Sequence, residues 1–220
     1  MSEISNFIKG RKIEEVLHFS TNHGLVGIAS IGQVISRDQL EVDPENDPKS
    51  PLFALNAKNS KFRSDPEWTS YINLSISRIN TSFLGFSRNW RKKDPDHYWI
   101  ILAFKPEILE HQDVFFSTTN NIYHNSCIRK QGIEGLQNCF SNCVISKHNQ
   151  PIDRPANYPS FWTTCQEAEV LYFKSLSLDY LKCIYVEDEG TYDQVVTTLH
   201  ALTDRTDINV IINKSKFEGQ

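Results

Sequence analysis

Short apolar segments of strand type, mixed with short helical segments in no regular alternation, limit most strongly how this chain can fold. The strand-type segments cover residues 16–20, 70–76, 97–105, 113–117, 168–173, 181–187 and 208–212. After the first of them, Asn22 is expected to cap a helix that runs to about Ser30 and ends at Gly32. None of the strand-type segments leads into a glycine-rich turn followed by a helix, as a doubly wound nucleotide-binding fold requires. The order of elements therefore predicts an α+β fold with mixed, mostly antiparallel sheets flanked by short helices.

The length of the chain and the lack of a linker-like stretch predict a single domain over residues 1–220. The longest apolar runs, such as residues 98–104, are too short to span a bilayer. The first twelve residues lack the apolar core of a secretion signal. We therefore expect a cytoplasmic protein without a membrane partner.

The formal net charge of -4 gives no global electrostatic reason to bind nucleic acid, so any such binding must be local. One basic cluster occurs, at residues 87–93. At helical spacing Phe83, Phe86 and Trp90 fall on one side, with the basic side chains mostly elsewhere. This pattern is typical of a helix that buries its aromatic face, and the alternative is a surface that contacts phosphates.

The number of cysteines is odd, which favours reduced thiols over a disulfide framework. The cysteines are Cys127, Cys139, Cys143, Cys165 and Cys183. Cys139, Cys143 and His148 have the look of half a zinc site, but no second cysteine pair completes four ligands. We therefore expect free thiols and no metal.

The common motifs of dinucleotide, P-loop, zincin and serine-hydrolase sites are absent from the sequence. What remains is polar residues at the ends of predicted strands: His18 with Ser20, Arg78, and Glu167 with Glu169. Alternate strand residues point the same way, so the two acids are expected to share one face. Each residue alone is more often structural than functional, but the paired acids follow an aromatic segment in an apolar context.

Several motifs in a fixed order resemble the DarT family of nucleic-acid base ADP-ribosyltransferases, and the similarity runs over nearly the whole chain. The segment VLHFSTNHGLVGIASIGQVIS matches the opening pattern of that family with His18, Ser20, Leu25, Ile28 and Gly32. The segment SYINLSISRIN resembles its central strand, which ends in an arginine that fits Arg78. The segment NYPSFWTTCQEAEVLYF places the catalytic glutamate of the family at Glu169.

The resemblance implies an ADP-ribosyltransferase fold and NAD as the co-substrate, with no metal. It assigns catalysis to Glu169 and Arg78, and NAD binding to His18, Ser20, Leu25 and Arg78. The residue types suit that chemistry, because a fixed carboxylate stabilises the positive charge that develops on the ribose carbon when nicotinamide leaves. The planar guanidinium of Arg78 suits the pyrophosphate or the acceptor.

The segment 146–164 is a long, proline-containing loop in our prediction, and loops of that length are usually functional. Tyr158 and Trp162, with Glu167 beyond them, would contact the acceptor, and the aromatic rings would stack on an unpaired base. A single strand is the cheaper target, because a base in a duplex must first be flipped out. The alternative is that these aromatic residues only pin the loop to the core.

The resemblance also implies a toxin that acts on single-stranded DNA and a partner macrodomain antitoxin of the DarG kind. The chain departs from the family at Glu167, where the family usually has glutamine. In related transferases a Glu-x-Glu pattern accompanies modification of arginine side chains. An arginine or RNA acceptor, or a non-catalytic nucleotide-binding module, therefore stays open as an alternative.

Overall fold

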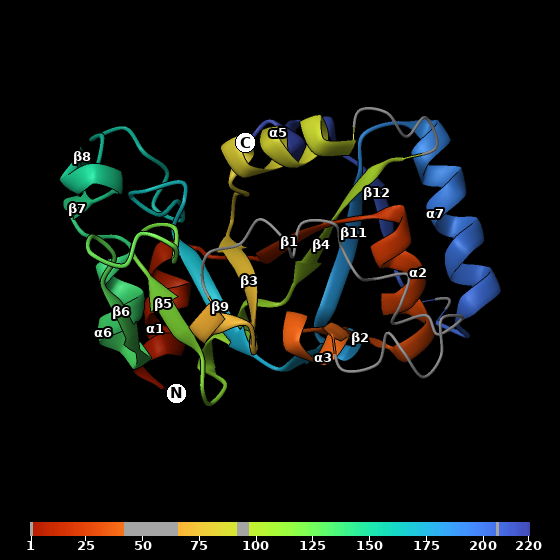
Figure 1. Ribbon diagram of the computed structural model, residues 1–220, viewed down its shortest axis with the longest axis horizontal. Coiled ribbons are helices and arrows are strands. Elements are labelled where there is room, and N and C mark those ends of the chain that lie inside the picture. Colours follow the sequence, from red (N-terminus) through yellow and green to blue (C-terminus); the bar gives the residue numbers. More distant parts are fainter. Residues whose placement is uncertain (1, 42–65, 92–96, 206) are drawn as a thin grey trace.

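One long sheet organises the computed structural model, which describes residues 2–41, 66–91, 97–205 and 207–220 (Figure 1). Its strand order is β12-β11-β4-β1-β3-β9-β5-β6, antiparallel throughout except for the parallel pair β11 and β12. The strands are β1 (Val16–Thr21), β3 (Tyr71–Ile76), β4 (Trp99–Phe104), β5 (Phe115–Ser117), β6 (Arg129–Gln131), β9 (Glu169–Phe173), β11 (Leu181–Val186) and β12 (Val210–Ile212). The predicted α+β class with mostly antiparallel pairing is confirmed.

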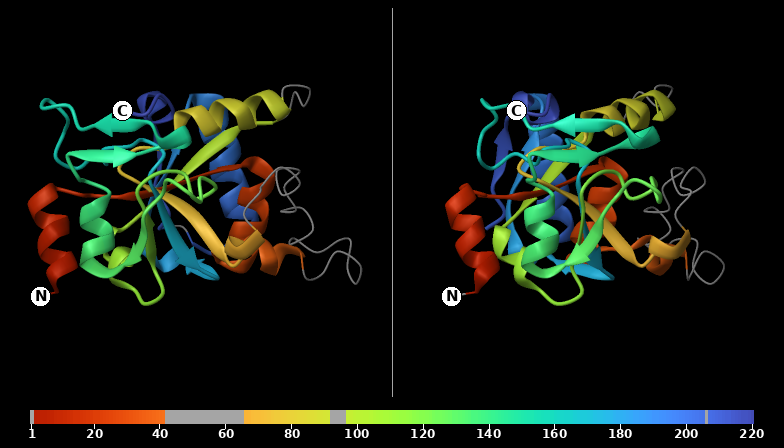
Figure 2. Two further views of the ribbon diagram at one scale, coloured as in Figure 1. Left: turned by 60° about the vertical axis from the view of Figure 1, so that its left-hand side comes forward. Right: turned by 90° about the vertical axis from the view of Figure 1, so that its left-hand side faces the viewer.

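Helices cover the sheet in three groups (Figures 1 and 2). At one end α2 and α7 lie side by side, at the other end α1 lies beside α6, and α5 runs near the carboxyl-terminal α8. Their bounds are α1 (Glu3–Arg11), α2 (Asn22–Ile31), α3 (Arg37–Glu41), α5 (Thr81–Arg91), α6 (Gly132–Asn138), α7 (Glu189–Leu202) and α8 (Lys214–Phe217). Short strand pairs complete the fold: β2 (Gln33–Ile35) with β10 (Ser175–Ser177), and β7 (Cys143–Ile145) with β8 (Pro151–Asp153).

The sheet is buried on both faces where its central strands run. Along β4, Ile100, Leu102 and Phe104 belong to the larger hydrophobic cluster, whereas Ile101 and Ala103 belong to a second cluster on the opposite face. Side chains alternate between the faces of a strand, so a continuous apolar run is what a strand covered on both sides needs.

The sheet opens between β1 and β3, which is the feature that positions the candidate site. β1 pairs with β4 along its whole length but with β3 only up to Leu17 and Ser75. The remainder of β3, from Tyr71 to Leu74, pairs with β9 on its other edge. His18 lies where the pairing stops, and its Nδ1 is 3.0 Å from the carbonyl oxygen of Asn73 on β3. Polar side chains thus meet where the two halves of the sheet diverge.

The junction between β1 and α2 differs by one residue from our prediction. We expected Asn22 to cap the helix, but Thr21 is the N-cap, and its Oγ1 accepts a hydrogen bond of 3.2 Å from the Gly24 amide. The hydroxyl of a threonine at the end of the strand caps the helix as well as the side chain of an asparagine one position later would. The predicted end at Gly32 is confirmed, in the left-handed conformation with φ of 71°.

The expected aromatic face of α5 is buried only in part: Phe83 packs against Phe19, with 5.6 Å between the ring centres. The buried side of the helix carries Leu84, whereas Phe86 is 60% exposed. Arg88 forms an ion pair of 2.7 Å with Glu187, so it is not a free phosphate contact. The side chains of residues 90 and 91, and all of residues 92 and 93, lie outside the described residues.

The segment 146–164 is less irregular than we predicted, because its first part belongs to a strand pair. β8 pairs with β7 in register from Cys143 opposite Asp153 to Ile145 opposite Pro151. The irregular stretch therefore shrinks to residues 154–164, which follow the hairpin.

All five cysteines are free. Cys139 is 1% exposed, and burial raises the pKa of its thiol to about 12, whereas Cys143 is exposed on the hairpin. In the described part of the chain no three potential ligands gather to hold a metal ion. Within the same residues, no helix has both the length and the apolar character to cross a bilayer.

Candidate active site

Glu169 is the first residue of β9, and its half-buried carboxylate is held by the neighbouring strand. Ser117 of β5 is its register partner, and the chain then turns so that the Asn121 amide donates a 2.8 Å hydrogen bond to Glu169 Oε2. Ser117 and Asn121 are fully buried, as is Thr119 between them. The carboxylate is therefore fixed by backbone in a rigid polar segment.

Glu167 does not share a strand face with Glu169, contrary to our prediction. It lies in a turn before β9 that Ala168 closes through a 3.1 Å hydrogen bond from its amide to the Cys165 carbonyl. Both acids nevertheless act on the phenol of Tyr123, because desolvation first, then Glu167 and, more weakly, Glu169 raise its pKa. Desolvation also raises the pKa of Glu167, against the hydrogen bond from Tyr123.

Arg78 follows β3 and is 6% exposed. Its Nη2 donates a 3.1 Å hydrogen bond to the Thr163 carbonyl. Its Cζ lies 4.9 Å from the ring centre of Tyr158 and 4.5 Å from that of Trp162. The aromatic residues of the segment therefore hold the arginine, which agrees with the alternative that they pin the loop to the core. Their contact with a base stays a prediction.

Gln166 ties the arginine and the acids together, and our sequence reasoning did not single it out. Its Nε2 donates 3.1 Å hydrogen bonds to the carbonyl of Ile79 and to Oγ1 of Thr81, just after Arg78. The turn that carries Glu167 is thus fastened to the end of β3. Asn121 was missed as well, because it lies far from the acids in sequence and nothing in its surroundings signals a role.

The residues predicted to bind NAD divide into two groups. His18 and Ser20 are half-buried at the opening of the sheet. A Cβ built on Gly24 would come within 2.1 Å of Ser20 Oγ, so the helix can approach Ser20 only because residue 24 is glycine. Leu25 is 1% exposed inside the larger hydrophobic cluster, which gives its side chain a packing role. Its assignment to NAD binding stays a prediction that only its backbone could fulfil.

Several buried polar atoms around the site have no hydrogen-bond partner among the described residues. They are Ser77 Oγ, Arg78 Nε, Asn121 Nδ2 and Trp162 Nε1. A buried polar atom without a partner costs free energy, and native proteins keep few of them. Ser77 is also held in the left-handed conformation, with φ of 61°. Unpaired donors and local strain together are typical of a site that a polar ligand completes.

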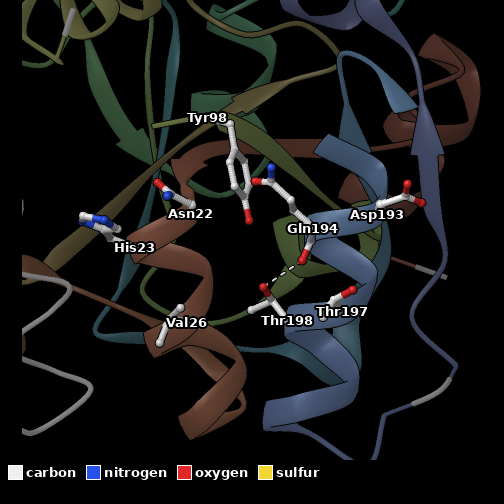
Figure 3. A pocket seen from close by; sticks show the side chains of 8 residues that line it. All are labelled: Asn22, His23, Val26, Tyr98, Asp193, Gln194, Thr197 and Thr198. Atoms are coloured by element: carbon white, nitrogen blue, oxygen red, sulfur yellow. Dashed lines mark hydrogen bonds between the residues drawn. The ribbon is translucent and has the colours of Figure 1, made fainter. Parts of the chain in front are cut away.

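A pocket of about 510 Å³ lies elsewhere, between α2 and α7 (Figure 3). His23 and Val26 line it from α2, Tyr98 from the start of β4, and Asp193 and Gln194 from α7. None of the predicted catalytic residues lines it. The candidate site is therefore the one formed by the carboxylates and the guanidinium group. A reaction needs charged groups of this kind, and the volume of a pocket does not supply them.

The family model described as "ssDNA thymidine ADP-ribosyltransferase, DarT" matches residues 17–217 of this chain. No curated protein matches the sequence. The match spans every residue of the candidate site, from His18 to Glu169.

Solved structures of the same name share the fold at low sequence identity. DarT of Thermus sp. 2.9 in complex with carba-NAD+ has a TM-score of 0.61 and 13% identity, over 93% of this chain and 98% of that chain. The same protein in complex with ADP-ribosylated ssDNA has a TM-score of 0.60 and 12% identity, over 93% and 96%. Thermosipho africanus DarTG in complex with ADP-ribose has a TM-score of 0.60 and 16% identity, over 93% of this chain and 51% of that chain.

Proposed function

The chain belongs to the DarT family of ssDNA thymidine ADP-ribosyltransferases, and we propose that it transfers ADP-ribose from NAD to a thymidine base in single-stranded DNA. One observation supports this most strongly. The carboxylate of Glu169, at the start of β9, is held by the backbone amide of Asn121. The turn before β9 is fastened through Gln166 to Ile79, the residue after Arg78. Such a site suits a reaction in which positive charge develops on a sugar carbon.

In this proposal Glu169 stabilises the charge on the ribose carbon as the bond to nicotinamide breaks. The hydrogen bond from Asn121 holds the carboxylate in place before the reaction, so that little reorganisation is needed. Glu169 also accepts the proton that the base nitrogen loses as it forms the new bond to that carbon. Positioned bases of this kind contribute about 10²- to 10⁴-fold in rate.

Arg78, His18 and Ser20 would hold NAD. The Arg78 guanidinium, with its Nε unpaired, offers a donor to the pyrophosphate. His18 and Ser20, at the opening of the sheet, offer hydrogen bonds to a ribose or to the nicotinamide amide. The unpaired buried donors around these residues support the fit.

Tyr158, Trp162 and Glu167 would lie on the acceptor side. The Trp162 ring stacks on Arg78 and would offer its other face to a base, and base stacking on an aromatic ring contributes about 1 to 3 kcal/mol. The Glu167 carboxylate is engaged by Tyr123, so it is not arranged as an isolated acceptor for an arginine substrate. We therefore favour the DNA base over an arginine.

The biological role follows from the family rather than from the geometry. We infer that the chain is a cytoplasmic toxin whose partner is a macrodomain antitoxin. The name of the Thermosipho africanus protein, DarTG, and the match to only about half of that chain support such a pairing. Growth arrest on expression of the chain, relieved by co-expression of a macrodomain hydrolase, is the expected result.

The reaction is tested by incubating the protein with NAD and short single-stranded oligonucleotides that contain or lack thymidine. Mass spectrometry is expected to find one added ADP-ribose on the thymidine-containing strands only, with release of nicotinamide. A protein substrate in the same mixture should stay unmodified. Modification of the protein alone, or of strands without thymidine, would reject the proposed acceptor.

A further inference from the structure

Arginines and aromatic rings alternate in a row that starts at Arg78 and runs away from the candidate site. The Tyr158 ring lies between Arg78, at 4.9 Å, and Arg154, at 5.7 Å. The Phe140 ring lies between Arg154, at 5.8 Å, and Arg11, at 5.0 Å. We call these five residues the arginine–aromatic column. Its arginines come from the end of β3, from the segment after β8 and from the last turn of α1.

The column brings three positive charges close together. Arg88 and Arg205, in contrast, are paired with the carboxylates of Glu187 and Asp207. None of the three column arginines has a carboxylate within ion-pair distance among the described residues. Aromatic faces offset part of the repulsion, because their quadrupoles attract cations.

The positive charges of the column affect the pKa of Arg154. Desolvation first, then the charges of Arg11 and Arg78, lower the pKa of its guanidinium. Its donors reach the carbonyls of Trp162, at 2.6 Å, and Pro159, at 2.8 Å, which shape the irregular segment. Backbone carbonyls satisfy the donors but leave the charge uncompensated, so an anion that approached the half-buried Arg154 and Arg11 would be attracted.

We propose that the arginine–aromatic column binds the phosphodiester backbone of the single-stranded substrate and leads it from Arg78 towards α1. The proposal rests on the proposed function. A single diphosphate does not account for a row of three guanidinium groups on three separate segments, whereas a strand carries a phosphate at every nucleotide. Single-strand surfaces combine a positively charged path along the backbone with aromatic rings. In this column the buried Phe140 ring only spaces the cations, which are the groups that would follow the backbone.

The test is the salt dependence of single-strand binding, measured without NAD by fluorescence anisotropy of a labelled thymidine-containing oligonucleotide. Arg11 is the best position, because its guanidinium makes no hydrogen bond within the described residues and its loss should spare the fold. For Arg11→Gln we expect the slope of log affinity against log salt to fall by about 0.7, and affinity to fall about fivefold at ~0.1 M salt. Arg154→Gln should act alike, and Arg154→Lys should recover much of the slope because it keeps the charge.

Arg205→Gln is the matched control, because it removes the same charge from a residue that is paired with Asp207 and Asp179. It should leave the slope unchanged. An oligonucleotide with uncharged methylphosphonate linkages should bind wild type and Arg11→Gln equally well.

Two results would overturn the proposal. One is unchanged DNA binding in folded Arg11→Gln and Arg154→Gln, which would leave the column a clamp for the segment 154–164. The other is a loss of NAD affinity, measured by calorimetry, with DNA affinity intact, which would assign the charges to the dinucleotide. Failure of the proposed function is separate, because it would appear as no ADP-ribose transfer by wild type, whatever the binding slopes.

Discussion

The Arg78 side chain lies against the Trp162 ring, with 4.5 Å between its Cζ and the ring centre, and donates a hydrogen bond to the carbonyl of Thr163. The buried arginine is thus both a candidate NAD ligand and the fastening of the segment that precedes Glu169. We therefore expect the position of the segment 154–164 to affect catalysis, because displacement of that segment would also move the arginine.

Arg78→Lys should separate charge from geometry. Lysine keeps the charge but lacks the planar fork that stacks on the rings and reaches the Thr163 carbonyl. We expect a loss of about 2 kcal/mol in the free energy of unfolding, from the lost stacking and the lost hydrogen bond. Transfer activity should fall at least about 100-fold. Urea denaturation and initial transfer rates measure the two effects, with the exposed Lys182→Arg as control.

Wild-type activity in Arg78→Lys would show that charge alone suffices at this position. Lower stability with unchanged turnover of the folded fraction would reduce Arg78 to a structural residue.

Gly24→Ala should disturb Ser20 without touching the acids. The added Cβ would come 2.1 Å from Ser20 Oγ, so the hydroxyl or the start of α2 must move. Overpacking of this kind costs about 1 to 3 kcal/mol, and a displaced Ser20 should raise the KM for NAD. Gly85→Ala is the control, because nothing lies within 4 Å of its added Cβ, and it should stabilise α5 by about 0.5 to 1 kcal/mol. Equal behaviour of the two variants would contradict the tight contact.

Glu167→Gln should remove a pH dependence of stability. Desolvation raises the pKa of this carboxyl above its ordinary value of 4.5, so the folded state binds the proton more tightly than the unfolded state does. The burial penalty is present above the raised pKa and disappears as the pH falls through the window down to 4.5. The free energy of unfolding of the variant should therefore exceed that of wild type most at neutral pH, and the gain should shrink towards about pH 4.

Urea titrations over that range, with exposed Glu107→Gln as control, measure the difference. A gain that stays constant with pH would show that Glu167 does not titrate as its burial requires.

Local signals predicted the fold well, and long-range contacts explain where prediction stopped. The alternation in residues 70–76 and the buried run in residues 98–104 marked strands because their periods report burial directly. Helix α5 buries only part of the face that the spacing predicts, since Phe83 is half-buried whereas Phe86 is exposed. Its orientation depends on contacts far along the chain, such as the ion pair of Arg88 with Glu187, that helical spacing does not encode.

The candidate site shows the same division. Glu169 and Arg78 could be predicted from motifs, since Glu169 begins a recognisable strand and Arg78 follows one. Asn121 and Gln166, which hold the two sides of the site in place, were not predicted. Their roles depend on how β9 lies between β5 and β3. The placement of Glu167 was wrong because the hydrogen bond that closes the turn before β9 leaves no periodic signal.

The most direct test of the account is the transfer rate of Glu169→Gln with NAD and a thymidine-containing single strand. Glutamine can still accept the hydrogen bond from the Asn121 amide, so the melting temperature should stay near that of wild type. The charge that stabilises the ribose carbon is gone, so we predict that transfer and nicotinamide release both fall by at least about 100-fold. A folded Glu169→Gln protein that modifies DNA at close to the wild-type rate would contradict the account.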